Sequence, residues 1–124
     1  MTVAELARSY SEAWCRRDAA LVASHYSQGG MIAINGGEPG PIEEVADAFI
    51  AAFPDILVFM DELVIRDDAT IEYRWTFTGT SAETGKAVRI PGSEVWTIGD
   101  DGLIETSTGT FDEAEYDRQL RDGA

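Results

Sequence analysis

A single glutamate, Glu94, is the residue of this sequence best placed for acid–base chemistry. It lies in the stretch Val88 to Ile98, whose alternation of apolar and polar residues predicts a strand with this carboxyl on the inward face. A carboxyl in apolar surroundings has a raised pKa and can carry a proton near neutral pH. The alternative is an edge carboxylate paired with Arg74 or Arg89, and a shift of one residue in register separates the two.

The other titratable side chains are less well placed. Asp112 is a candidate base, but it also suits the N-cap of a final helix, with Glu115 three residues on to complete a capping box. His25 is interpreted as a packing residue or an exposed group rather than a base, and Cys15 has no visible base partner. With one histidine and one cysteine there is no zinc pattern, so we expect no metal and no other cofactor.

Charge and length limit the kinds of partner. The 124 residues fit one domain, 1–124, and 23 acidic against 9 basic side chains give a formal net charge of -14. This charge opposes binding to nucleic acid and to anionic membrane surfaces. The longest uncharged run, Ala19 to Gly37, contains polar residues and is not a membrane span. The N-terminus reads as a helix without a secretory signal, so we expect a cytoplasmic protein.

The first half of the chain has helical periodicity broken by turn-forming residues. The expected elements are a helix from the N-cap Thr2, with Glu5 completing a capping box, to about Arg17; a short helix capped by Asp18, running through Tyr26 and ended by Gly29-Gly30; a short strand over Met31 to Asn35; and a helix from Pro41 that Pro54 stops.

From Ile56 onward the apolar period changes to two. The expected elements are four strands, over Ile56 to Ile65, Thr70 to Gly79, Ala87 to Ile98 and Leu103 to Phe111, and a closing helix over Asp112 to Leu120. Short turns favour an antiparallel meander. Helices followed by strands indicate an α+β domain in which helices cover one face of a strongly curved antiparallel sheet and enclose a hollow for a small ligand.

Alternation also predicts which side chains face that hollow. Tyr73 and Trp75 share one face of their strand, and Ser107, Gly109 and Phe111 share one face of theirs. A glycine at 109 opens volume, which favours a cavity over simple core packing.

The order of elements resembles the nuclear-transport-factor-2-like superfamily, and several strings resemble its SnoaL-like branch of polyketide cyclases. The strings are Ala52-Phe53-Pro54-Asp55, Arg74 to Thr80, Thr84-Gly85-Lys86, Asp101-Gly102-Leu103-Ile104 and Phe111-Asp112. The resemblance covers nearly the whole chain and implies a cystatin-like cone of helices on a curved sheet. It also implies homodimerisation through the outer sheet face. This superfamily includes isomerases, dehydratases, epoxide hydrolases, cyclases and non-catalytic members, so fold alone does not give the reaction.

Alignment with the ketosteroid isomerases implies roles for three residues. Tyr10 matches their oxyanion-binding tyrosine, Tyr26 a second tyrosine bonded to the first, and Glu94 their protonated aspartic acid. An acid kept neutral by apolar surroundings can donate a hydrogen bond.

Other family positions depart from the known patterns. The isomerase base maps onto Ile34 or Asn35, and the cyclase His-Trp pair maps onto Ser107-Thr108. The aspartate of the epoxide hydrolases maps onto Gly109. An enzyme with this sequence therefore needs a modified catalytic set.

These residues give a leading hypothesis of a SnoaL-like enzyme that performs acid/base catalysis on a small apolar carbonyl or polycyclic substrate. Tyr10 is expected to polarise a substrate oxygen, Glu94 to carry a proton and Asp112 to act as base if it turns inward. The expected ligand-binding residues are Trp14, Tyr26, Asn35, Phe49, Tyr73, Trp75, Trp96, Ser107 and Phe111. The alternative is a non-catalytic module for ligand binding or dimerisation, and an epoxide hydrolase ranks third.

Overall fold

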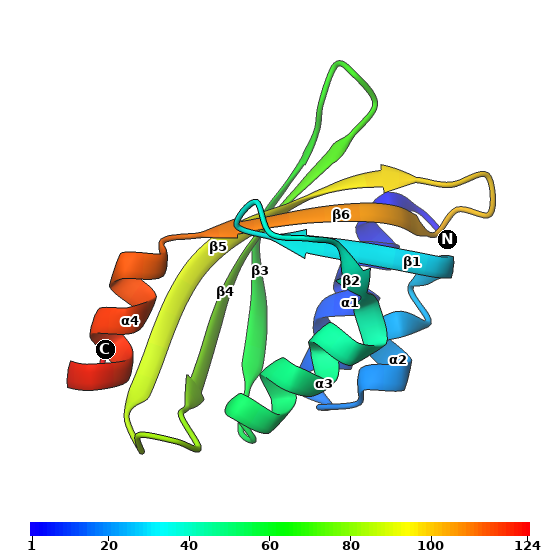
Figure 1. Cartoon of the computed structure of the whole chain (residues 1–124). Helices are drawn as coiled ribbons and strands as arrows, with labels where there is room; N and C mark the ends of the chain where they lie inside the picture. The colour runs from blue at the N-terminus through cyan, green and yellow to red at the C-terminus, as the bar shows by residue number, and fades with distance from the viewer.

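The computed structural model describes residues 1–124 as four helices packed on a six-stranded mixed sheet (Figure 1). The helices are α1 (Val3–Cys15), α2 (Ala19–Ala23), α3 (Ile42–Ala52) and α4 (Glu113–Asp122). The strands are β1 (Tyr26–Ile34), β2 (Gly40–Pro41), β3 (Leu57–Ile65), β4 (Ile71–Thr80), β5 (Ala87–Ile98) and β6 (Ile104–Phe111). Their order in the sheet is β2-β1-β6-β5-β4-β3, and the α+β fold class is confirmed.

The start of each of the first two helices is fixed by a side-chain cap. The Thr2 hydroxyl accepts from the Glu5 N–H at 3.1 Å, and the Glu5 carboxylate accepts from the Thr2 N–H at 2.9 Å, which confirms the predicted capping box. Asp18 accepts from the Leu21 N–H and begins α2. The apolar face of α1, with Tyr10 fully buried, packs against the sheet.

The prediction for α2 was wrong at its end. The helix stops at Ala23, and Tyr26 already belongs to β1. The pair Gly29-Gly30 lies inside this strand, where the register against β6 shifts between Tyr26 and Met31. Gly29 has a φ of +76°, and a Cβ on Gly30 would lie 2.6 Å from the Cβ of Tyr26. The two glycines therefore permit a bulge in a strand rather than end a helix.

The four later strands form the predicted antiparallel meander, with bounds within one residue of those expected. The short strand expected over Met31 to Asn35 is part of the longer β1, which pairs in parallel with β6 and makes the sheet mixed instead of antiparallel. This pairing aligns Ile32 with Ser107 and Ile34 with Gly109. An apolar strand thus joins the inward face beside β6, although about seventy residues separate the two strands in the chain.

Helix α4 closes the end of the sheet where β6 stops. The last residue of β6, Phe111, pairs with Gly92, so the first residues of β5 have no neighbour on that side. The Gln119 side chain takes this place: its oxygen accepts from the Arg89 N–H at 2.7 Å and its NH₂ donates to the Arg89 carbonyl at 3.1 Å. A side chain thus satisfies backbone groups at an exposed edge.

Two observations concern possible partners of the protein. No helix is both long and apolar enough to cross a membrane. On the outer face of the sheet Phe59 is 47% exposed, opposite Thr76 in register. Homodimerisation through that face stays a prediction.

Gly92 offers a test of the packing on the inner face. A Cβ at this position would lie 2.5 Å from two atoms of the Trp75 ring and 2.7 Å from the Thr110 carbonyl oxygen. We expect Gly92→Ala to lower the free energy of unfolding by about 1–3 kcal/mol in urea denaturation, because ring and backbone must both move.

Gly109→Ala is the matched control for this substitution. Its Cβ would meet its nearest neighbours at 3.7–3.8 Å, which is ordinary contact, so we expect a change within about 0.5 kcal/mol. Equal losses in the two variants would contradict the packing described for Trp75.

Candidate active site

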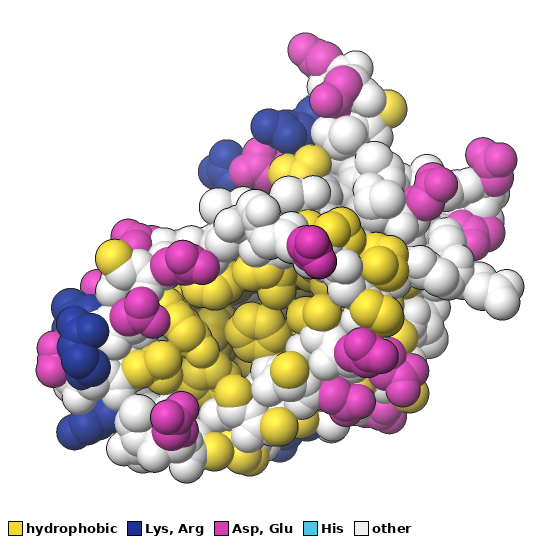
Figure 2. All heavy atoms as spheres, viewed as in Figure 1, with side chains coloured by type: hydrophobic (Ala, Val, Ile, Leu, Met, Phe, Trp, Pro, Cys, Tyr) yellow, Lys and Arg dark blue, Asp and Glu magenta, His cyan; other side chains and the backbone are white.

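A hydrophobic pocket opens between α3 and the concave face of the sheet (Figure 2). Its empty volume is about 530 Å³ including the open mouth, and acidic side chains surround that mouth. Twelve residues line it. Ten are hydrophobic, namely Trp14, Ile32, Ile34, Val45, Phe49, Ile56, Val58, Trp75, Phe77 and Phe111, and the other two are Glu94 and Gly109. Concave, mostly apolar spaces with a few polar groups are the usual sites of small-ligand binding.

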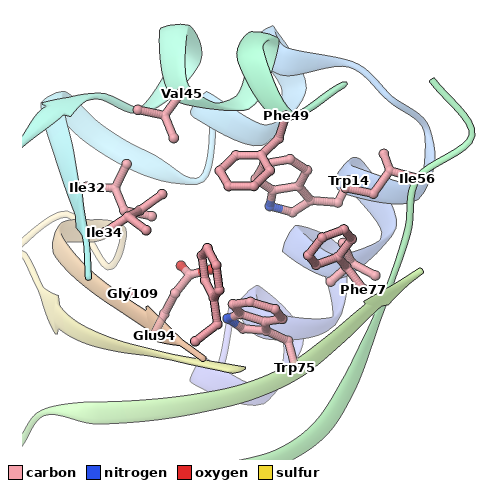
Figure 3. A pocket seen from close by; sticks show the side chains of 12 residues that line it. Trp14, Ile32, Ile34, Val45, Phe49, Ile56, Trp75, Phe77, Glu94 and Gly109 are labelled. Carbon is pink, nitrogen blue, oxygen red and sulfur yellow. The ribbon is translucent and has the colours of Figure 1, made fainter. Parts of the chain in front are cut away.

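Glu94 is the only ionisable residue in this lining. It pairs with Tyr73 on β4 and with Gly109 on β6, and the residue is 7% exposed. The carboxyl points into the cavity (Figure 3). Arg74, the rival partner of an edge carboxylate, instead binds Glu62 and Glu72, each at 2.8 Å. The register therefore gives Glu94 the inward orientation.

Four donors converge on one oxygen of the Glu94 carboxyl. Oε1 lies 3.1 Å from the Tyr10 hydroxyl, 3.4 Å from the Tyr26 hydroxyl, 3.0 Å from the Trp96 indole N–H and 3.0 Å from the Ser107 hydroxyl. No side chain or backbone group donates to Oε2. The carboxyl is thus held from behind through one oxygen, and the other is free for a ligand in the pocket.

Burial controls the protonation of this cluster. Burial in apolar surroundings raises the pKa of Glu94 above its ordinary value of 4.5, and the hydrogen bonds from its four donors oppose that rise. Burial, followed by the charge of Glu94, raises the pKa of Tyr10 and of Tyr26 well above the ordinary tyrosine value. Both phenols therefore stay protonated and act as donors to Glu94, which is the group that can exchange a proton with a ligand.

Aromatic packing fixes the donors behind Glu94. The Tyr73 ring stacks on the Trp96 indole, with ring centroids 4.8 Å apart. The Tyr10 ring packs against the same indole in an edge-to-face arrangement, with ring centroids 5.4 Å apart. The Tyr73 hydroxyl lies 2.5 Å from the Ser11 hydroxyl, so it is paired away from the pocket. Such edge-to-face and stacked pairs orient rings that have little freedom to turn.

The structure divides the expected ligand-binding residues into two layers. Four of them, Trp14, Phe49, Trp75 and Phe111, line the pocket. Four others do not line it and form the layer behind Glu94: Tyr26, Tyr73, Trp96 and Ser107.

Tyr10 belongs to the same rear layer, which revises its expected role. It is fully buried and absent from the pocket wall, because its hydroxyl is directed at Oε1 of Glu94. Its hydroxyl therefore orients the carboxyl and does not reach the pocket wall.

Asp112 and Asn35 also differ from expectation. Asp112 is exposed and accepts from the Glu115 N–H at 3.0 Å, so it is the N-cap of α4 and not a base in the pocket. The Glu115 carboxylate binds Arg118 at 2.8 Å instead of completing a capping box. Asn35 accepts from the Phe111 N–H at 2.9 Å and holds the end of β6, outside the pocket lining.

His25 is a packing residue, which is one of the two roles interpreted from the sequence, and it is not an exposed group. It is buried, with its ring nitrogens 2.7 Å from the Ser9 hydroxyl and 2.8 Å from the Leu21 carbonyl oxygen. No group of three or more histidine, cysteine or acidic side chains is arranged to hold a metal ion.

Several wall residues were missed at the sequence level. Phe77 continues the alternation of Tyr73 and Trp75, and Val45 lies one helical turn before Phe49, so both carried a usable signal. Ile32 and Ile34 reach the pocket only because β1 pairs with β6, and no local pattern indicates that pairing.

Comparison with known proteins identifies the family of this chain. Residues 7–106 match the SnoaL-like domain. The chain belongs to the SnoaL-like domain family. No curated protein matches the sequence significantly.

Solved structures with the same fold share little sequence with this SnoaL-like chain. AclR from Streptomyces galilaeus, named as a candidate hydroxylase, is 19% identical with a TM-score of 0.79, over 96% of this chain and 86% of that one. SalBIII, an epoxide hydrolase/cyclase-like enzyme of pyran ring formation in salinomycin, is 14% identical with a TM-score of 0.77, over 90% and 92%.

A protein with a ketosteroid isomerase-like fold from Catenulispora acidiphila is 11% identical with a TM-score of 0.80, over 92% of this chain and 90% of that one. At these identities the similarity shows the shared fold.

The raised pKa of Glu94 predicts a pH-dependent stability. Because the folded protein favours the protonated form more than the unfolded chain does, this contribution is complete below pH 4.5 and is lost as the pH rises through the raised pKa. Glu94→Gln cannot ionise. We expect its free energy of unfolding, relative to wild type, to increase from pH 4 to pH 8 in urea denaturation.

Ser107→Ala sharpens this test, because it removes one donor from Oε1 without adding bulk. It should raise the pKa of Glu94 further, as read from the carboxyl carbon in an NMR titration. A wild-type midpoint at or below 4.5 would show that the hydrogen bonds outweigh burial.

The placement of Asp112 predicts a structural effect. Asp112→Ala should lower the free energy of unfolding by about 1 kcal/mol, because α4 loses its cap, whereas Asp112→Asn should keep most of the stability. Thermal unfolding of both variants measures this. An unchanged stability of the alanine variant would rule out the capping role.

Proposed function

We propose that this protein is a cofactor-free enzyme of cyclase or isomerase type that acts on a small, largely apolar carbonyl compound through Glu94. The observation that carries the proposal is the asymmetry of this carboxyl: four donors surround Oε1, while Oε2 has none and belongs to a group that points into an apolar pocket. A group held in one orientation with a free oxygen suits proton transfer.

The reaction can be written from this geometry. Oε2 of ionised Glu94 takes a proton from the carbon next to the substrate carbonyl; that C–H bond breaks and its electron pair forms the C=C bond of an enolate. When the substrate is a β,γ-unsaturated ketone, the enolate is conjugated with its C=C bond, and the protonated carboxyl returns the proton to the γ carbon. The C=C bond moves into conjugation with the carbonyl, which is an isomerisation. Alternatively the enolate carbon attacks the carbon of a second carbonyl group in the same molecule. A C–C bond then forms, the π bond of that second carbonyl breaks, and its oxygen takes the proton from Glu94, which closes a ring. Positioned proton transfer of this kind contributes about 10²–10⁴-fold to rate.

The pocket favours a neutral, flat and mostly apolar substrate. Five aromatic residues stand in its wall, and aromatic faces pack well against ring systems. Acidic side chains around the mouth and a net charge of -14 oppose an anionic substrate. The names of the similar structures, which include a cyclase-like enzyme, support this class of reaction.

A second candidate is a non-catalytic module that captures a small molecule in the same pocket. The cyclase His-Trp pair is replaced by Ser107 and Thr108, and the similar protein from Catenulispora acidiphila was solved with trimethylamine bound. Epoxide hydrolysis ranks third, because Glu94 is the only carboxyl in the wall and that reaction needs a second acidic group with a partner arginine.

Exchange of hydrogen for deuterium tests the leading proposal without knowledge of the natural substrate. We expect the wild-type protein to accelerate exchange of the α-hydrogens of small cyclic ketones in D₂O, followed by NMR. Glu94→Gln should reduce this rate at least 100-fold, because it removes the base but keeps the shape.

Glu105→Gln is the matched control, since Glu105 is exposed on β6 and absent from the pocket wall. It should leave the exchange rate unchanged. Binding of the ketones without accelerated exchange across the whole panel would favour the capture module.

A further inference from the structure

The pocket wall contains a polar group that the fold leaves without a partner. The indole N–H of Trp75 is buried from solvent and has no acceptor, and Trp75 lines the pocket. Most buried N–H groups in proteins are paired, so an unpaired one in a ligand pocket indicates an acceptor that arrives with the ligand.

Packing fixes the direction of this N–H. Trp75 lies opposite Gly92 in the β4–β5 register, and its ring lies so close to the β5 backbone that a Cβ on Gly92 would be 2.5 Å from it. Its other aromatic neighbours are Phe77 and Phe111, with centroids 6.0 and 6.3 Å away. Neither side chain offers a strong acceptor, because an aromatic ring accepts only weak hydrogen bonds.

The same patch of wall also holds an unpaired acceptor. Glu94 follows Gly92 by two residues on the inward face of β5, so Trp75 and Glu94 are diagonal neighbours across the strand pair. Figure 3 shows both side chains at the cavity, with the indole nitrogen on the side of the ring toward Glu94. The mostly hydrophobic wall thus holds an unpaired donor on one strand and the free Oε2 on its diagonal neighbour.

We propose that Trp75 and Glu94 form a two-point site for a ketone that carries a hydrogen on the carbon next to its carbonyl group. The Trp75 N–H donates to the ketone oxygen, and Oε2 of Glu94 faces the adjacent C–H. This inference rests on the proposed function, and it names the group that receives the substrate oxygen.

The assignment gives Trp75 the role expected of Tyr10 from the sequence, which is to polarise the substrate oxygen. When Oε2 removes the proton, the electron pair of the C–H bond forms the C=C bond and the carbonyl π electrons move to oxygen. The developing negative charge then lies at the atom bonded to the Trp75 N–H, and a fixed donor in a water-poor site stabilises that charge. Tyr10 is directed at Oε1, on the far side of the carboxyl.

A pair of ligands of equal shape tests this site. Cyclohexanone and methylenecyclohexane differ by an oxygen in place of a CH₂ group, and both can be titrated by NMR. We expect wild type to bind the ketone more tightly than methylenecyclohexane. The ratio of the two dissociation constants should fall about five- to ten-fold in Trp75→Phe, which is the loss typical of one neutral hydrogen bond. The α-hydrogen exchange rate should fall in the same variant, while methylenecyclohexane binding stays nearly constant.

Trp14→Phe is the matched control, because it makes the same change in the second indole of the wall. It should keep the preference for the ketone. Loss of the preference in Trp14→Phe instead, or an unchanged preference in Trp75→Phe, overturns the assignment.

A measurement on the wild-type protein tests the site even if the variants do not fold. The infrared carbonyl stretch of bound, ¹³C-labelled cyclohexanone should lie at lower frequency than in hexane, because a hydrogen bond weakens the C=O bond; an unshifted band overturns the proposal.

The proposed function and the Trp75–Glu94 site can be refuted independently of each other. Trp75-dependent ketone binding without any exchange refutes the enzyme and keeps the site, whereas Glu94-dependent exchange at full rate in Trp75→Phe refutes the site and keeps the enzyme.

Discussion

The burial of one carboxyl group is the constraint on which the rest of this structure depends. Glu94 stands in the wall of an apolar pocket, and a polar group in such a place is tolerated only when hydrogen bonds replace its contacts with water. The protein supplies four donors to a single oxygen. They come from α1, β1, β5 and β6, so the cluster also joins the N-terminal helix to three strands of the sheet. The contacts that hold the carboxyl in the pocket wall therefore also link separate elements of the fold.

The concentration of donors on Oε1 separates two tasks within one side chain. The bound oxygen, Oε1, fixes the position of the carboxyl, and the other oxygen, Oε2, accepts no hydrogen bond from the protein. Tyr10, Tyr26, Trp96 and Ser107 consequently act through Glu94 and are not themselves parts of the wall. The wall in turn is built from aromatic and aliphatic side chains on α1, α3 and the concave face of the sheet. Membership in the SnoaL-like family fits this design, because the fold supplies a pocket and leaves the chemistry to a few residues.

Small residues determine where the polar groups of the wall lie. Gly92 allows the Trp75 indole to lie against the backbone of β5, and Gly109 leaves space beside Glu94. Gly29 and Gly30 allow β1 to change register, so that Tyr26 turns inward before the apolar part of the strand begins. The shape of the pocket thus depends as much on missing side chains as on the aromatic ones.

Local patterns in the sequence determined most of the elements and the orientation of Glu94. The capping residues Thr2, Asp18 and Asp112 fixed helix starts, and the period of two in the later strands fixed which side chains face inward, because both depend on neighbours a few residues apart. The inward position of Glu94 followed from this alternation.

The tertiary structure alone decided which inward side chains line the pocket. Tyr10 and Glu94 are 84 residues apart, and their contact takes Tyr10 out of the pocket wall. Ile32 and Ile34 enter the wall through a parallel pairing between distant strands, which no local period encodes. The unpaired N–H of Trp75 also emerges only from packing, because periodicity gives the face of a strand but not the hydrogen-bond partner of each atom on it.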